Sequence, residues 1–235
     1  MDCIKKEKLN IILLIDTSKS MQGKRIKEVE QAILDIQNYL KELQYENSNV
    51  DFFLTLIQFA TDACLYKNTK EVNIDNFKFD GIKCYGYSNL HLGYNLLIKL
   101  LRRESDGGIM PDFAGAAPII LLLTDGHPTG NKYKDSLAKL VEISWFKSAL
   151  RYGIAVGLDD KRTTQVLKAF VQESGDVITC YKAEMLKDII KIIIMTASKS
   201  RSTSLDVATG PNVPQNQIVK QLIADALSDT EGWTW

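Results

Sequence analysis

The amino-acid sequence predicts an α/β protein with a doubly wound, mostly parallel central sheet and helices on both faces. Continuous apolar runs at residues 11–15, 118–126 and 152–158 are typical of strands buried on both faces. Between these runs lie segments with apolar residues at steps of three and four, which are typical of amphipathic helices. Strands that alternate with helices form open sheets, and ligands bind outside the carboxyl ends of their strands.

The first half of the chain is expected to begin with the strand at residues 11–15. An amphipathic helix is expected at 25–43, followed by a strong strand at 50–60. Two weaker segments, 64–66 and 71–74, are expected to form a short edge strand. A second helix is expected at 90–101, since its apolar residues again follow a helical spacing.

The second half begins with a long polar loop that contains several glycines, at residues 102–117. Strands and helices are then expected to alternate to the end of the domain. In order, they are a strand at 118–126, a helix at 135–150, a strand at 152–158, a helix at 163–173, a strand at 176–181 and a helix at 184–196.

The composition changes near residue 200, so residues 1–200 are predicted to form one domain and residues 201–235 a linker with a short C-terminal helix. The tail regains an apolar stripe at helical spacing and ends in two tryptophans. We expect Ile218, Leu222, Trp233 and Trp235 to dock on a protein partner, with the domain's own flank or a second copy as alternatives.

The bulk composition excludes several classes of protein. The chain has 29 Lys+Arg and 29 Asp+Glu, so its zero net charge argues against nonspecific binding to nucleic acid or to an anionic membrane. None of the four cysteines forms a CxxC pair, and two histidines are too few for His-rich metal chemistry. No export signal or membrane span is visible, and we expect a cytoplasmic protein.

Oxygen-bearing side chains follow the predicted strand ends. Asp16, Ser18 and Ser20 alternate along the loop after the first strand, so their side chains can point the same way. Asp125 ends the 118–126 strand, and Ser88 precedes a helix. Carboxylate and hydroxyl oxygens suit Mg²⁺, with Mn²⁺ or Ca²⁺ as alternatives, and water completes the coordination of Mg²⁺.

Three motifs resemble one known family. DTSKSM resembles the Asp-x-Ser-x-Ser element of von Willebrand factor A domains, GYSNLHLGYNLL resembles their second loop and helix, and LLLTDGHPTG resembles their third metal loop. The resemblance implies a metal-ion-dependent adhesion site in which some contacts run through water. Its residues would be Asp16, Ser18, Ser20, Ser88 and Asp125.

Four segments narrow the resemblance to the tellurium-resistance TerY-type proteins: IILLIDTSKSMQGKRIKEVEQAI, TDGHPTG, GIAVGLDDKRTTQVLKAF and ASKSRSTS. That family consists of bacterial, cytoplasmic proteins with a single A domain. It is associated with Ter stress-response systems, and often with a protein kinase and a PP2C-type phosphatase. These proteins are therefore the partners that the resemblance implies.

The sequence departs from the family pattern at the rim of the expected site. Lys19 stands where a glycine is common between the two serines, Tyr87 replaces a glycine of the second loop, and Ser88 replaces the usual threonine. We expect Lys19, Tyr87 and His127 to form the rim that meets a partner. Alternatively, Lys19 is only solvated and His127 only makes local hydrogen bonds.

An enzyme is the competing interpretation. A metal-dependent phosphatase or phosphotransferase would use Asp16 as its nucleophile. Ser18 occupies the position at which the haloacid-dehalogenase type needs its second acid, and neither a P-loop nor a Gly-x-Gly-x-x-Gly fingerprint is present. We therefore predict no catalytic residues, and a binding module whose metal accepts a Glu or Asp side chain from a protein partner.

Overall fold

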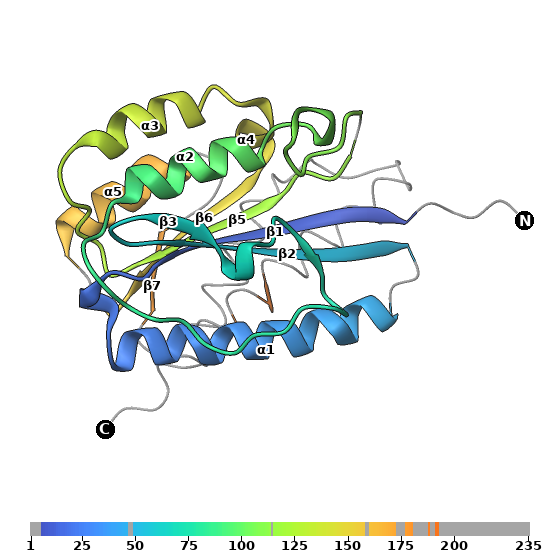
Figure 1. Ribbon diagram of the computed structural model, residues 1–235, viewed down its shortest axis with the longest axis horizontal. Helices are drawn as coiled ribbons and strands as arrows, with labels where there is room; N and C mark the ends of the chain where they lie inside the picture. The colour runs from blue at the N-terminus through green and yellow to red at the C-terminus, as the bar shows by residue number, and fades with distance from the viewer. Residues whose placement is uncertain are drawn as a thin grey trace, which may run out of the picture.

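A mixed β-sheet with helices on both faces forms the centre of the protein, as the sequence predicts (Figure 1). The computed structural model describes residues 6–46, 49–113, 115–157, 160–172, 177–180, 188, 191 and 192. The seven strands are β1 (Glu7–Asp16), β2 (Val50–Phe59), β3 (Ala63–Leu65), β4 (Val72–Asn73), β5 (Ile119–Thr124), β6 (Leu150–Val156) and β7 (Val177–Cys180).

The strand order is β3-β2-β1-β5-β6-β7, and β4 pairs with β2 beside β3. The strands β2, β1, β5, β6 and β7 all run parallel, whereas β3 and β4 run antiparallel to β2. The two weak segments therefore form edge strands, as predicted. In this register Asp16 lies opposite Phe59 of β2, and the preceding Ile15 lies opposite Leu123 of β5.

Helices lie on both faces of the sheet. The long helix α1 (Lys24–Glu46) covers one face, and α2 (Leu90–Leu100), α3 (Lys132–Leu140), α4 (Ser144–Ser148) and α5 (Lys161–Val171) lie on the other (Figure 1). Side chains of β1 alternate between the two cores, as a strand requires. Ile11 and Leu13 pack in the core beneath α1, whereas Ile12 and Leu14 pack in the core beneath α2 and α5.

The described residues also contain three short 3-10 helices. They are η1 (Lys19–Met21), η2 (Tyr66–Asn68) and η3 (Glu104–Asp106). The first of these leads from the end of β1 into α1, and the third lies in the predicted loop at 102–117.

The prediction of a single helix at 135–150 is wrong. Helix α3 ends at Leu140, α4 begins at Ser144, and Leu150 already belongs to β6. Leu140 and Phe146 are both fully buried in the same core. On one straight helix, side chains six residues apart point about 120° apart, and the break between the two helices lets both face the same core.

The end of the chain is described only in part. Strand β7 confirms the strand predicted at 176–181, and residues 188, 191 and 192 are helical within the helix predicted at 184–196. The tail residues Ile218, Leu222, Trp233 and Trp235 lie outside the described residues, so the domain boundary near residue 200 stays a prediction. Within the described ranges, every helix is too short or too polar to cross a membrane.

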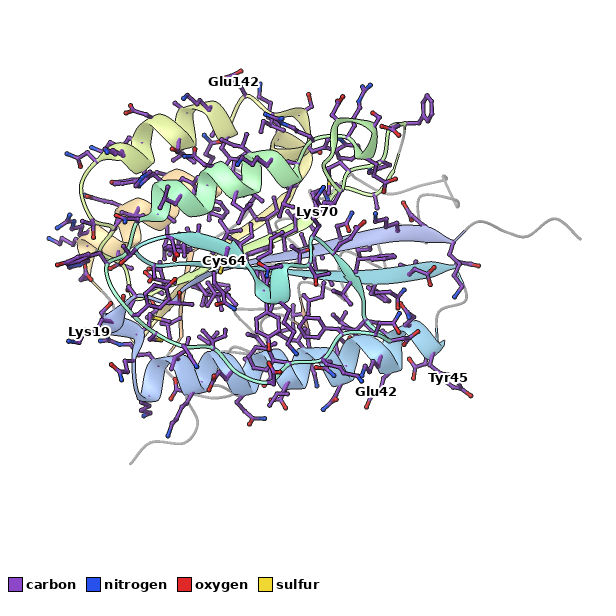
Figure 2. All side chains as sticks on the ribbon, viewed as in Figure 1. Lys19, Glu42, Tyr45, Cys64, Lys70 and Glu142 are labelled. Carbon is purple, nitrogen blue, oxygen red and sulfur yellow. The ribbon has the colours of Figure 1, made fainter. Side chains whose placement is uncertain are left out.

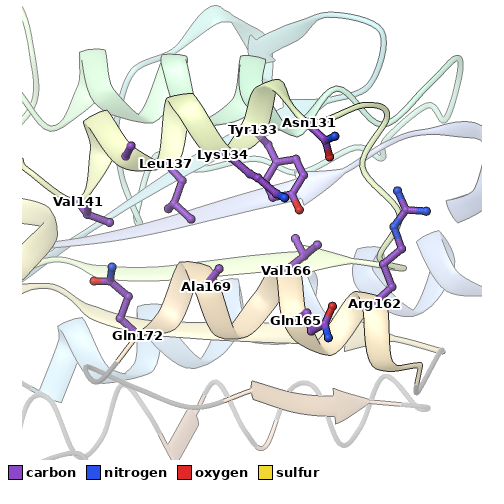
Figure 3. A pocket seen from close by; sticks show the side chains of 11 residues that line it. Asn131, Tyr133, Lys134, Leu137, Val141, Arg162, Gln165, Val166, Ala169 and Gln172 are labelled. Carbon is purple, nitrogen blue, oxygen red and sulfur yellow. The ribbon is translucent and has the colours of Figure 1, made fainter.

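A surface groove of about 940 Å³ lies between α3 and α5 (Figure 3). Tyr133, Leu137 and Lys134 line it from α3, and Arg162 and Val166 line it from α5. None of the predicted site residues that the structure describes lines this groove. The hollow is therefore separate from the carboxyl ends of β1 and β5.

Helix α5 approaches β6 closely at Gly153, which leads to a first prediction. A Cβ atom added to Gly153 would lie 2.8 Å from the Cβ of Leu167. We expect Gly153→Ala to lower the free energy of unfolding by about 1–3 kcal/mol, because neither backbone can move without disturbing the core. Urea denaturation measures the change. Lys168→Ala, on the exposed face of α5, is the control, and equal stability of both variants would contradict the packing described here.

Candidate metal site

The predicted metal ligands meet at the carboxyl ends of β1 and β5. Asp16 is the last residue of β1, and Asp125 directly follows β5. The chain leaves β1 through α1 on one face of the sheet and reaches β5 after α2 on the other face. Such a change of direction opens a crevice between two strands at the edge of the sheet, where ligands of doubly wound proteins bind.

Asp16 is the buried centre of this site. Its side chain is fully buried, and Oδ1 accepts a hydrogen bond from the backbone N–H of Ser18 at 2.9 Å. Oδ2 accepts hydrogen bonds from the hydroxyls of Ser88 at 2.8 Å and Thr124 at 2.7 Å. Burial raises the pKa of the Asp16 carboxyl, and the hydrogen bonds from Ser18, Thr124 and Ser88 oppose that shift.

The outer part of the site is a chain of hydroxyl and carboxylate groups. The Oγ atoms of Ser18 and Ser20 lie 3.0 Å apart, and the Ser20 hydroxyl donates to Oδ1 of Asp125 at 2.9 Å. Oδ2 of Asp125 accepts a hydrogen bond from Nη1 of Arg25 at 2.7 Å. The five residues predicted as ligands therefore lie in one cluster, and their binding of a metal stays a prediction.

Two glycines allow the surrounding loops to come close. Gly86 has a φ of +64°, and a Cβ there would lie 1.9 Å from Oγ1 of Thr61. Gly126 has a φ of +112°, and a Cβ there would lie 1.7 Å from Oγ1 of Thr163. Side chains at either position would be strained and would collide with a neighbouring loop. These close approaches hold Ser88 and Asp125 next to Asp16.

The donor set fits a hard divalent cation. In the part of the chain that the structure describes, no three His, Cys, Asp or Glu side chains gather in one place, so a metal here depends on hydroxyls and water beside two carboxylates. Mg²⁺ prefers such oxygen donors and usually keeps several of its waters.

Two residues of the site were not predicted from the sequence. Thr124 donates to Asp16 and also accepts a hydrogen bond from the backbone N–H of Gly126 at 2.9 Å, so it links the end of β1 to the loop after β5. The feature of the sequence that points to Thr124 is its position at the end of the apolar run that forms β5. Arg25 donates a hydrogen bond to Asp125. The feature of the sequence that points to Arg25 is its positive charge in the first turn of a helix, where acidic residues are favoured.

The three predicted rim residues differ in their surroundings. Lys19 is exposed at the end of the molecule where β1 passes into α1, and its backbone N–H donates to the carbonyl of Gly86 at 3.2 Å (Figure 2). Tyr87, on that same loop, is 69% exposed. His127 is half-exposed, and its Nε2 lies 3.1 Å from Oδ2 of Asp160. The local hydrogen bond that the sequence offered as an alternative for His127 is therefore present.

Comparison with known proteins identifies the family of the domain. The family model for the von Willebrand factor type A domain matches residues 10–193. The chain belongs to this family. The match includes all five predicted ligands and every strand from β2 to β7. Membership of the von Willebrand factor A domain family thus accounts for the sheet and its flanking helices.

The curated relatives of this A domain are only partly similar. The chain is 32% identical over 126 residues to inter-alpha-trypsin inhibitor heavy chain H4 of Bos taurus, and 28% identical over 120 residues to heavy chain H1 of Sus scrofa. Each match covers 51% of this chain and 13% of the relative. The chain therefore corresponds to a small part of these longer proteins.

Solved structures share the A-domain fold. The pilus adhesin SpaC of Lactobacillus rhamnosus GG matches with a TM-score of 0.58 and 13% identity, over 85% of this chain and 31% of that one. The ArnB paralog VWA2 of Sulfolobus acidocaldarius matches with a TM-score of 0.54 and 17% identity, over 80% of this chain and 45% of that one. At these identities the likeness shows the fold alone.

Metal binding provides the second prediction. We expect Asp16→Ala to abolish the binding of Mg²⁺ or Mn²⁺, because Asp16 is the buried carboxylate on which Ser18, Ser88 and Thr124 converge. Ser20→Ala should weaken binding less, since water can replace a neutral hydroxyl. Isothermal titration calorimetry measures both affinities. Asp106→Ala in η3 is the control, because η3 lies near Lys8 at the other end of β1, and unchanged affinity of Asp16→Ala would contradict the site.

The N-terminus of α5 provides the third prediction. Asp160 caps this helix, and hydrogen bonds from Thr163, His127 and Arg162 lower the pKa of its carboxyl. We expect Asp160→Ala to lower the thermal midpoint by about 2–4 °C, whereas Asp160→Asn keeps an acceptor for the cap.

The pH dependence of this effect follows from the lowered pKa of Asp160. Stabilisation by a carboxylate with a lowered folded-state pKa is complete above the ordinary value of 3.8 and disappears as the pH falls through the folded-state pKa. The difference in thermal midpoint between wild type and Asp160→Asn should therefore shrink below pH 3.8. A difference that grows on acidification would contradict the assigned shift.

Proposed function

We propose that this protein is a divalent-metal-dependent protein-binding module and not an enzyme. The observation that supports this most is the convergence of the Asp16 and Asp125 carboxylates with three serine hydroxyls at one surface edge of the sheet. Asp16 is fully buried, while Ser20 is exposed. The cluster therefore extends from the core to the solvent, where a partner can reach it.

Asp16, Ser18, Ser20, Ser88 and Asp125 would hold the ion, either directly or through water. Mg²⁺ is the first candidate, and Mn²⁺ and Ca²⁺ are alternatives. When bound, the ion would supply positive charge and a coordination position for a Glu or Asp side chain of a protein partner. Exposed Tyr87 and Lys19 would contact the partner around that carboxylate, as aromatic and basic residues do at binding hot spots.

The enzyme alternative has less support in the geometry. A nucleophilic Asp16 would have to present a carboxylate oxygen to a phosphoryl group. The side chain is fully buried, and both oxygens already accept hydrogen bonds. The groove between α3 and α5 does not include Asp16. A phosphatase or phosphotransferase thus remains the second candidate.

A role in a bacterial, cytoplasmic Ter-type stress-response system is the most specific form of the proposal. It is supported by the likeness of four segments to TerY-type proteins, and it makes a protein kinase and a PP2C-type phosphatase the first partners to test. The curated relatives found by comparison are animal proteins with other names, so this form depends on that likeness alone. Nucleic acid and membrane are not proposed as partners. The tail, through Ile218, Leu222, Trp233 and Trp235, would hold a second protein away from the metal.

A pulldown from the native host tests the proposal and is the fourth prediction. The tagged protein should retain a partner in Mg²⁺, release it in EDTA and recover it when Mg²⁺ is restored. Asp16→Ala should retain none of that partner, and Asp106→Ala should behave as wild type. Phosphatase turnover by the purified protein that Asp16→Asn abolishes would reverse the choice between a binding module and an enzyme.

A further inference from the structure

The first turn of α1 carries an unusual charge for a helix start. Lys24, Arg25 and Lys27 all lie there, and the turn contains no acidic residue. The partial positive charge of a helix N-terminus disfavours cations, so three basic residues there destabilise the helix unless another group compensates. Arg25 has such a group, since the Asp125 carboxylate lies against it from the opposite loop.

Arg25 is fixed by contacts from several elements. Its Nη1 donates to Oδ2 of Asp125 at 2.7 Å and to the backbone carbonyl of Ser20 at 2.9 Å. A Cβ atom added to Gly157, after β6, would lie 3.2 Å from its Nε. The Asp125 side chain is 4% exposed and that of Arg25 is 32% exposed. The guanidinium therefore shields one side of a buried carboxylate, and Ser20 contacts the other oxygen.

This contact changes the charge of the whole site. The carboxylates of Asp16 and Asp125 and the guanidinium of Arg25 together carry one net negative charge. A divalent ion would turn that into one net positive charge, whereas without Arg25 the loaded site would be neutral. A site that carries a net positive charge and is partly shielded from water attracts an anion.

We propose that Arg25 is a specificity-determining residue that makes metal binding depend on an anionic ligand. Arg25 and the ion compete for the same Asp125 carboxylate, so the ion binds weakly when no anion is present. An anion at the free coordination position then restores neutrality, and metal and anion bind cooperatively. By linkage, the anion must strengthen metal binding by the same factor by which the metal strengthens anion binding. This inference rests on the proposed metal site.

Lys24 provides a matched control in the same turn. Its side chain is 85% exposed and lies 3.7 Å from Glu28, so Lys24→Gln removes the same formal charge without touching Asp125. Arg25→Gln removes the guanidinium from Asp125. Arg25→Lys keeps a cation at the position, although its ammonium cannot reproduce the planar guanidinium geometry.

The experiment is a Mn²⁺ titration of the full-length protein and these variants. Calorimetry or electron paramagnetic resonance measures the affinity. Potassium chloride and potassium acetate are compared at equal ionic strength, with acetate as the carboxylate probe. In chloride, Arg25→Gln should bind Mn²⁺ roughly tenfold more tightly than wild type, because one cation a few ångströms away has been removed. Acetate should tighten binding to wild type and Arg25→Lys, and should tighten it much less in Arg25→Gln.

Each outcome has a definite meaning. A wild-type protein that binds no Mn²⁺ in either chloride or acetate would overturn the proposed metal site, and this inference with it. A wild type that binds Mn²⁺ with the same affinity and acetate response as Arg25→Gln overturns the role of Arg25 alone. An equal gain in Lys24→Gln also overturns it, since the effect would then be long-range charge. Circular dichroism of each variant verifies that its fold is retained.

Discussion

The burial of the Asp16 carboxylate is the constraint on which the site and its loops depend. An ionised carboxylate that is removed from water is strongly destabilising unless hydrogen bonds or opposite charges replace its hydration. Here the N–H of Ser18 and the hydroxyls of Ser88 and Thr124 replace it, and they come from three separate parts of the chain. The hydrogen bonds to the Asp16 carboxylate therefore hold together the loop after β1, the end of β5 and the loop before α2.

The two cores fix that carboxylate at the carboxyl edge of the sheet. Apolar side chains of β1 pack on α1 on one face of the sheet and on α2 and α5 on the other. Because the strand is buried on both sides, its apolar residues cannot shift along the register without exposing one core. The first polar side chain after the run is therefore fixed at the edge of the sheet. At the end of β5 the corresponding residue is Thr124, and Asp125 directly follows it.

The site residues that follow a local pattern of apolar runs and helix starts can be predicted from the sequence. Asp16, Ser88 and Asp125 each end an apolar run or precede a helix, so their meeting follows from the parallel sheet. Arg25 and Thr124 were missed because their importance comes from contacts with distant parts of the chain. The break between α3 and α4 was missed for a similar reason, since apolar spacing shows which residues are buried but not where the backbone must turn to bury them.

The short strands at one side of the sheet have a consequence for how the protein avoids unwanted association. Strand β2 is ten residues long, and β3 and β4 pair antiparallel with it along its outer edge. A long unpaired edge strand readily adds a strand from another chain, which leads to aggregation, and short flanking strands limit this. Recognition through backbone strand addition is thereby disfavoured on this side. In the proposed function, side chains of the loops at the carboxyl end of the sheet would select the partner.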